Sequence, residues 1–132
     1  QRTRTWAPCS SGGWASVTVD EQGAHVRVRC GAVLDAVVLR SYCIGAVHMA
    51  LGWVTSEGLT VDADGSVASL TVRSFGIVRP GEMIPVEVEI IDEPGVEPVN
   101  GSDAVFAATA AAVWIAQGTP PAWPTGRPVT SV

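Results

Sequence analysis

The sequence predicts an α+β fold in which antiparallel hairpins form a sheet and two helices pack on that sheet. Three observations favour this class. Several segments alternate apolar and polar residues with the period of two that is typical of strands. Two longer segments are rich in small and apolar residues and are long enough for helices. Turn-forming residues separate these segments, and the resulting order is ββα-βββ-α.

The first half of the chain is predicted to contain one hairpin and one long helix. Residues 14–20 (WASVTVD) and 24–30 (AHVRVRC) alternate as strands do, and turn-forming residues join them. The helix is expected from about residue 34 to about residue 57. Its apolar part is long enough to span a membrane, but Arg40 and His48 interrupt it. A helix buried within the protein is therefore predicted.

The second half is predicted to contain a hairpin, a strand and a second helix. The hairpin covers residues 59–74 and turns at Asp64-Gly65. Residues 84–91 (IPVEVEII) alternate Ile and Val with Glu, which predicts a strand with one solvated face. The helix is expected over residues 103–117, with Gly118 as the C′ residue that ends it.

Length and composition predict one globular domain. The 132 residues are 47% hydrophobic and 16% charged, which suits a single packed core and argues against a disordered chain. We expect the domain to cover residues 13–118, between an irregular N-terminal arm (1–12) and a Pro-rich C-terminal tail (119–132). Because the chain begins with Gln1 rather than Met, we expect either a trimmed start or a piece of a longer protein.

Charge and cysteine content narrow the function classes. The chain has no Lys and a net charge of −5, which argues against a nucleic-acid-binding surface. Cys9, Cys30 and Cys43 lack the spacing of a metal site, and their odd number argues against a disulfide scaffold. Reduced thiols in a cytoplasmic protein are the expectation.

Catalytic and metal-binding motifs do not stand out. The sequence has no GxSxG, HExxH or GxxxxGK[ST] motif. His25 and His48 lack a second ligand at helical spacing, so structural hydrogen-bonding roles are predicted for both. Glu87 and Glu89 are interpreted as a solvated strand edge. No metal ligand is predicted.

The best candidate site is the loop that precedes the second helix, residues 97–103 (EPVNGSD). Ser102 has the chemistry of a helix N-cap, and Asp103 in the first turn complements the helix dipole. The functional alternative is that free backbone N–H groups at this helix start bind an anion. Residue chemistry alone favours the cap.

Two stretches add a resemblance to a known family. Residues 37–59 (VVLRSYCIGAVHMALGWVTSEGL) and 100–114 (NGSDAVFAATAAAVW) resemble, in order and spacing, the C-terminal portion of the molybdenum-cofactor subunit of the xanthine dehydrogenase and aldehyde oxidase family. In the first stretch the residues that match the family are Gly45, Gly52, Glu57 and Leu59. The resemblance covers residues 13–117.

The resemblance implies a role in a cofactor site. In that family this region helps to enclose molybdopterin, and the enzymes hydroxylate aldehydes or nitrogen heterocycles. Carried to this chain, it implies cofactor contacts at the backbone N–H groups of Gly101 and Ser102, with Tyr42 and Gly45 lining the approach. Other domains or subunits of a larger oxidoreductase would supply the rest of the site.

The family's polar side chains have changed at these positions. Ser102 stands where the family has its catalytic Glu, while Tyr42 and Met49 stand where it has Gln. A lone hydroxyl is too weakly basic to replace that Glu. Asp103 lies one position along, where a helix turns the side chain by about 100°. We therefore predict no catalytic residue, and a domain that is not catalytic by itself.

A second hypothesis comes from another class of protein. The chain could be a non-catalytic α+β interaction module that kept the fold and lost the cofactor site. The flat helix face at Gly45, Ala46 and Ala50 would then pack on a partner or on a second copy. The first hypothesis predicts exposed apolar surface that meets other domains, whereas a self-contained module should have its long helix covered. Neither hypothesis involves nucleic acid or a membrane.

Overall fold

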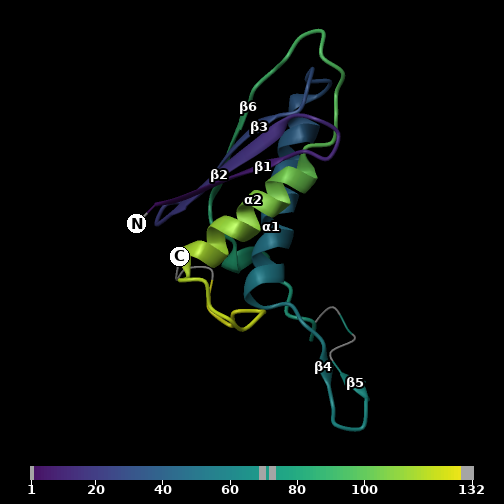
Figure 1. The fold of residues 1–132 in the computed structure, drawn as a ribbon, viewed down its shortest axis with the longest axis vertical. Helices are drawn as coiled ribbons and strands as arrows, with labels where there is room; N and C mark the ends of the chain where they lie inside the picture. The colour runs from purple at the N-terminus through teal and green to yellow at the C-terminus, as the bar shows by residue number, and fades with distance from the viewer. Residues whose placement is uncertain (1, 69–70, 72–73, 129–132) are drawn as a thin grey trace.

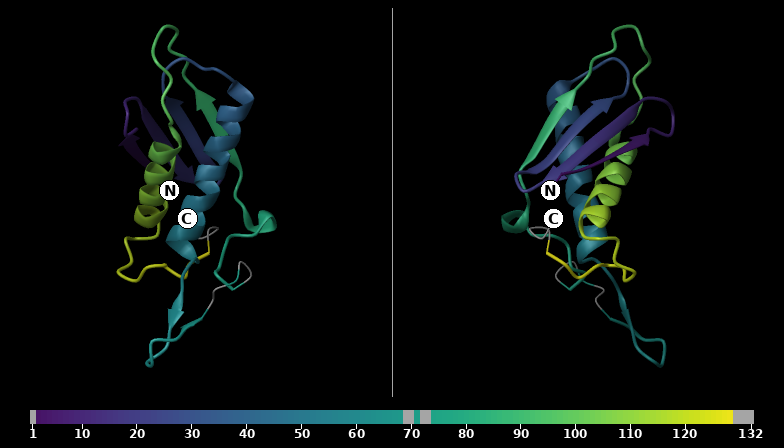
Figure 2. Two further views of the ribbon diagram at one scale, coloured as in Figure 1. Left: turned by 90° about the vertical axis from the view of Figure 1, so that its right-hand side faces the viewer. Right: turned by 60° about the vertical axis from the view of Figure 1, so that its left-hand side comes forward.

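The α+β prediction is confirmed by the computed structural model, which describes residues 2–68, 71 and 74–128. One four-stranded sheet has the order β1-β2-β3-β6, and two helices pack on one of its faces (Figures 1 and 2). The elements of this body are β1 (Thr3–Pro8), β2 (Trp14–Asp20), β3 (Gly23–Arg29), α1 (Ala36–Thr55), β6 (Val86–Ile90) and α2 (Ser102–Ala116).

Strand β1 corrects the prediction of an irregular N-terminal arm. It pairs antiparallel with β2, from Thr3 opposite Val19 to Pro8 opposite Trp14. An edge strand needs a partner on one side only, so polar residues and a terminal proline are tolerated there. Because many residues of this segment are polar, its strand pattern does not stand out in the sequence. Pairing with β2 determines that it forms a strand.

Strand β6 pairs parallel with β3, which the prediction of antiparallel hairpins did not include. The register places Ala24 beside Val86 and Val28 beside Ile90. Parallel neighbours need a long crossover connection, and α1 with the segment after it supplies one. The alternation of residues 84–91 predicted a strand correctly, but its partner and direction depend on where that crossover ends.

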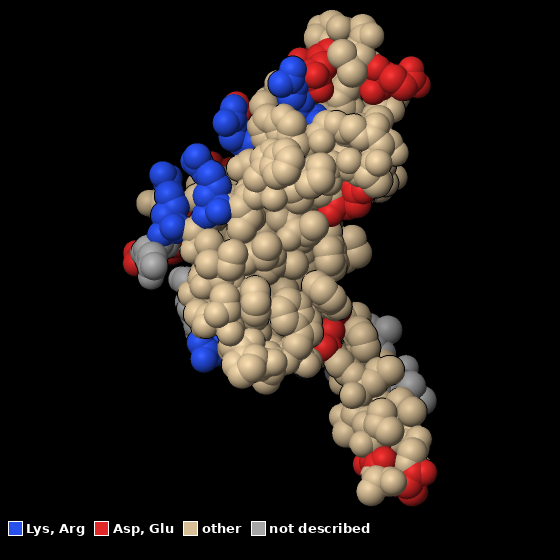
Figure 3. Space-filling view, in the orientation of Figure 1, with Lys and Arg blue, Asp and Glu red and all other residues tan. Residues whose placement is uncertain are grey.

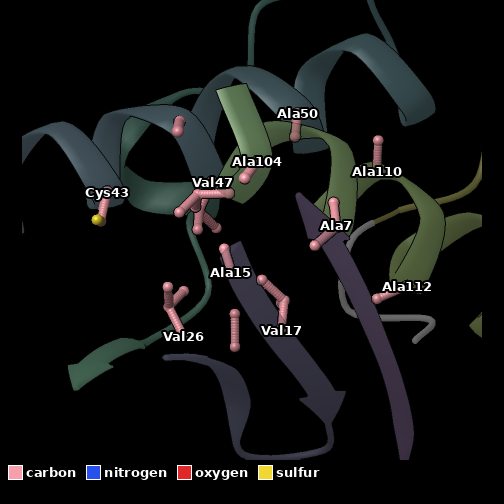
Figure 4. Close-up of a cluster of buried hydrophobic side chains, with 14 of the residues drawn as sticks. Ala7, Ala15, Val17, Val26, Cys43, Val47, Ala50, Ala104, Ala110 and Ala112 are labelled. Carbon is pink, nitrogen blue, oxygen red and sulfur yellow. The ribbon is translucent and has the colours of Figure 1, made fainter. Parts of the chain in front are cut away.

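The core lies between the sheet and the two helices (Figure 4). Alternate residues of β2 and β3 point into it, and small residues of the helices allow the backbones to approach closely. On α1, Ala46 and Ala50 are fully buried and pack within the protein's own core. The flat face that we proposed as a docking surface is therefore covered by the chain itself, although Gly45 lies at its border.

The prediction that α1 is a buried helix is only half right. The side toward the core is buried, while five large apolar residues elsewhere on the helix, its outer side, are exposed: Val37, Val38, Tyr42, Ile44 and Met49. Trp53 is also partly exposed, but its ring packs on Phe106 of α2, with centroids 5.5 Å apart. By length and composition α1 is the one helix among the described residues that could cross a membrane. Its packing against the sheet and α2 is that of the core helix of a globular domain.

A small hairpin projects from the end of α1 (Figure 1). It consists of β4 (Thr60–Val61) and β5 (Val67–Ala68), and it turns at Gly65, whose φ is 86°. The predicted turn is confirmed, whereas residues 69–70 and 72–73 of the predicted hairpin lie outside the described residues. A short 3-10 helix, η1 (Pro80–Glu82), then leads into β6.

The C-terminal tail packs across the ends of both helices. The indole of Trp123 lies against Trp53 and Trp114, with ring centroids 4.9 and 6.1 Å away. The N–H groups of Thr125 and Gly126 donate to the last carbonyls of α1, on Val54 and Thr55 (2.8 and 2.9 Å). The described part of the tail therefore caps the helix end.

Candidate functional site

A cavity of about 430 Å³ lies where α1 and α2 begin, beside the loop that follows β3. Its volume is in the range of small-molecule sites. The cavity is lined by Cys30, Ala32, Val33, Leu34, Asp35, Val38, Leu39, Tyr42, Pro98, Val99, Asn100, Gly101 and Ser102.

The structure brings together three of the four candidate residues of the sequence analysis. Tyr42 comes from α1, and Gly101 and Ser102 come from the start of α2. Gly45 does not line this cavity; it borders a separate pocket with Ile44 and His48. Nearly one turn of helix separates Tyr42 from Gly45, and the segment before β6 lines the pocket that Gly45 borders.

The start of α2 differs from the prediction that Ser102 is the N-cap. The N-cap residue is Gly101, and Ser102 is the first helical residue. The side-chain oxygen of Asn100 accepts from the Ser102 N–H at 3.0 Å and from its hydroxyl at 2.7 Å. A Cβ on Gly101 would lie 3.0 Å from Val28 Cγ2, so close packing on β3 explains a glycine at the cap. Asn100 provides the polar partner instead.

The start of α1 adds a residue that the sequence analysis missed. Asp35 is the N-cap, and its Oδ1 accepts from the N–H groups of Val37 and Val38 at 3.0 and 3.1 Å. The signal was present, because an Asp directly before an apolar segment is a typical N-cap. Placing the helix start at residue 34 put Asp35 inside the helix and hid it.

Carboxylates hold the loop between β3 and α1 that forms one wall. The N–H of Gly31 donates to Glu93 Oε1 at 3.2 Å, and the N–H of Val33 donates to Asp92 Oδ1 at 2.9 Å. The backbone of the 92–101 loop adds two hydrogen bonds, from Ala32 to Val96 and from Val99 to Cys30. The wall is therefore fixed by the segment that leads into α2.

Asp103 does not face the cavity. Its Oδ2 accepts from the backbone N–H of Ser10 at 3.1 Å. Hydrogen bonding by Ser10, from its side chain first and from its backbone second, lowers the pKa of Asp103 below the ordinary value. The expectation that Asp103 cannot replace the family's Glu agrees with this position. Asp35 is the carboxylate that lines the cavity.

The three cysteines are free thiols in the core, as predicted. Burial raises the pKa of Cys9 and of Cys43 to about 11, and it also raises the pKa of Cys30, which lies in the cavity wall. Thiolates are scarce at neutral pH under these conditions, so the cysteines are packing residues rather than nucleophiles.

The two histidines have structural partners. His48 Nε2 lies 2.6 Å from the carbonyl of Val78, and His25 Nδ1 lies 3.2 Å from Glu87 on the solvated face of the sheet. On that face Arg27 also pairs with Glu89 at 2.9 Å, which confirms the solvated strand edge. Within residues 2–68, 71 and 74–128, no group of three His, Cys, Asp or Glu side chains could hold a metal ion.

Comparison with known proteins places this fold inside larger enzymes. No protein-family model and no curated protein matches the sequence. Reconstituted CO dehydrogenase from Oligotropha carboxidovorans matches with a TM-score of 0.67 and 12% identity, over 81% of this chain and 15% of that chain. A Cu,Mo-CO dehydrogenase in its carbon-monoxide-reduced state matches with a TM-score of 0.62 and 10% identity, over 84% and 14%.

Quinoline 2-oxidoreductase from Pseudomonas putida 86 matches with a TM-score of 0.60 and 16% identity, over 77% of this chain and 14% of that chain. At such identities the likeness is one of fold. The chain spans about one seventh of the length of the structures that it matches, and it has the fold of a segment of these oxidoreductases.

Proposed function

We propose that this chain is a domain related to the molybdopterin-binding region of molybdenum hydroxylases of the xanthine dehydrogenase and aldehyde oxidase type. It forms one wall of a site that is shared with other domains or subunits, and it is not catalytic alone. One observation supports the proposal above all. In a fold shared with segments of molybdenum-type oxidoreductases, Tyr42, Gly101 and Ser102 meet at one cavity.

The residues at the cavity fit only part of such a cofactor. The volume and the apolar walls suit a ring system. The Ser102 N–H, which we nominated as an anion contact, is engaged by Asn100, and Asp35 puts a carboxylate at the same cavity. A phosphate or another anionic group does not fit there, because like charges repel and none of the described residues that line the cavity is cationic.

No catalytic step is assigned to this chain. The Ser102 hydroxyl donates to Asn100, and a serine hydroxyl is too weakly basic to take a proton near neutral pH. Asp103 is turned toward Ser10. In the proposed function the chain therefore shapes and encloses the site, and the proton acceptor comes from elsewhere. A cytoplasmic location is part of the same proposal.

A second candidate is an interaction module that has lost the cofactor. The observation that favours it is the loss of the family's Glu and Gln at Ser102 and Tyr42, together with the uncovered outer side of α1. The docking surface would then be that outer side, where Val37 is 73% exposed and Met49 56% exposed. The buried face at Ala46 and Ala50 is excluded from this role.

Metal analysis of the native species separates the two candidates. The chain would be tagged in its native host, purified, weighed by intact mass spectrometry and analysed for molybdenum. Molybdenum near one equivalent, in a long polypeptide or a stable complex, is expected. A free protein of this length without molybdenum would leave the interaction module standing.

A matched pair of variants connects the metal to the cavity. Tyr42→Ala removes a cavity-lining side chain and should lower the molybdenum content. Ser41→Ala removes an exposed side chain of the same helix that does not line the cavity, and it should leave the content unchanged. Equal content in both variants would contradict a cofactor contact at this wall.

A further inference from the structure

The cavity at the start of α1 and α2 carries a negative charge from one carboxylate and neutral polar groups beside it. Among the described residues that line it, Asp35 is the only charged one. Two more carboxylates, Asp92 and Glu93, hold the adjacent loop through its N–H groups. Arg40 lies on the same helix but does not line the cavity, and its guanidinium reaches the carbonyl of Val88 at 3.5 Å. Glu93 is paired with Arg29 at 2.9 Å, so the charge that the cavity itself presents is the negative charge of Asp35.

The Asp35 carboxylate is held in place and still has capacity to bind. Its Oδ1 accepts the two N–H groups of the first turn of α1. Among the described residues, Oδ2 has no hydrogen-bond donor. Because the N-cap contacts fix the side chain, a ligand would meet a carboxylate oxygen without ordering a flexible side chain first.

An aromatic ring stands two helical turns further along the same face. Tyr42 follows Asp35 by seven residues, which on a helix brings both to one side. Tyr42 is 65% exposed, and its hydroxyl has no partner among the described residues. Val38 and Leu39 lie between them and form an apolar wall. Aromatic faces attract cations, so this ring and Asp35 favour the same kind of ligand.

The other side of the cavity can also accept hydrogen bonds. The Ser102 hydroxyl directs its proton to Asn100, which leaves its lone pairs available. Pro98 and Val99 continue the apolar wall beside it. In the part of the chain that the structure describes, the cavity thus combines apolar walls with acceptor groups and has no cationic side chain in its lining.

We infer that this cavity binds a small planar aromatic molecule that carries a cationic or hydrogen-bond-donating nitrogen group, such as an amidinium or an amine. The ring lies between the apolar walls, and the nitrogen group meets Asp35 and Tyr42. Anionic ligands of the same size are rejected by the Asp35 charge. This selectivity goes beyond the proposed function, because it concerns the free chain and does not depend on molybdenum.

Three isosteric probes test the inference: benzamidine, benzamide and benzoate, which carry a positive charge, no charge and a negative charge. Binding to the full chain would be measured by calorimetry and by amide chemical shifts around Asp35 and Gly101. We expect benzamidine to bind roughly tenfold more tightly than benzamide, as for a hydrogen bond to a charged group, and benzoate to bind weakest. Equal affinities for benzamidine and benzoate would overturn the inference, as would the absence of binding by all three probes.

The decisive variant is Asp35→Asn. Asn caps a helix about as well as Asp, so α1 should still form while the charge is removed. Benzamidine and benzamide should then bind with about equal affinity. Asp62→Asn is the matched control, since it removes the same charge from the exposed projecting hairpin. An unchanged preference in Asp35→Asn, with thermal unfolding that shows a folded protein, would refute the assignment.

Discussion

At the residue scale, the geometry of the cavity depends on a glycine that the sequence did not single out. Gly31 lies directly after β3 with a φ of 87°, a conformation that side chains rarely adopt. A Cβ there would collide with the backbone oxygen of Glu97. Because residue 31 has no side chain, the 92–101 loop packs directly against the loop between β3 and α1. Asp92 and Glu93 then accept hydrogen bonds from the N–H groups of that loop.

Gly31→Ala should therefore destabilise the protein strongly, by about 2–4 kcal/mol, because strain and a backbone collision add. Gly95→Ala is a suitable control: Gly95 also has a positive φ, of 82°, but a Cβ there would meet nothing within 4 Å. It should cost only about 1 kcal/mol, from the conformation alone. Urea unfolding measures both, and similar losses in the two variants would contradict the role of the close approach.

The candidate residues show how far single positions could be predicted. Tyr42, Gly101 and Ser102 were nominated from a resemblance, and the fold brings them to one cavity. Gly45 was nominated with them and lies elsewhere, because one helical turn changes which loop a residue faces. Ser102 was predicted as a cap from its chemistry, but packing of Gly101 on β3 shifted the helix start by one residue.

At the scale of elements, periodicity predicted most strands and both helices. The helix boundaries differ from the observed ones by one or two residues, which is the uncertainty of fraying ends. The elements that were missed or incomplete depend on distant partners. Strand β1 exists because β2 pairs with it, and β6 runs parallel to β3 because of the crossover between them.

The tail illustrates an element whose role only its contacts show. Trp123→Ala should remove the ring contacts to Trp53 and Trp114 and destabilise the protein by about 1–2 kcal/mol. Because Trp123 anchors the capping segment, hydrogen exchange should also speed up at Thr125 and Gly126.

Trp6→Ala provides the comparison for the tail variant. Trp6 is 62% exposed on the edge strand, so its removal should change the unfolding free energy by less than about 0.5 kcal/mol. If the two substitutions had equal effects on stability, or if exchange at residues 125 and 126 did not respond to the loss of Trp123, the capping role of the tail would be wrong.

At the scale of the whole molecule, charge and apolar surface are separated. Arg side chains gather along one side, beside the strands, and many of the carboxylates lie toward the two ends (Figure 3). The outer side of α1 remains apolar and uncovered. Exposed apolar patches of this kind are typical of surfaces that meet other protein. This agrees with the first hypothesis, which predicts that the isolated chain exposes apolar surface that meets other domains.

The isolated chain should therefore self-associate as its concentration rises. The double variant Val37→Glu/Met49→Glu places charges on the outer side of α1 and should restore a monomer. Ser11→Glu/Gln22→Glu adds the same net charge at exposed loop positions and should behave like the original chain. Sedimentation velocity over a range of concentrations distinguishes them. A monomer at all concentrations, or equal suppression by both variants, would contradict an association through α1.

The sequence by itself determined the elements whose patterns are local. Alternation predicted β2, β3 and β6, small apolar residues predicted α1 and α2, and Asp64-Gly65 predicted a turn, since these signals depend on neighbours along the chain. Only the tertiary structure decided what covers each face and which residues share a site. It buried Ala46 and Ala50, exposed the other side of α1, and placed Asp35 beside Tyr42 and Ser102 at one cavity. These outcomes depend on contacts between segments that are distant in sequence, and no local pattern encodes them.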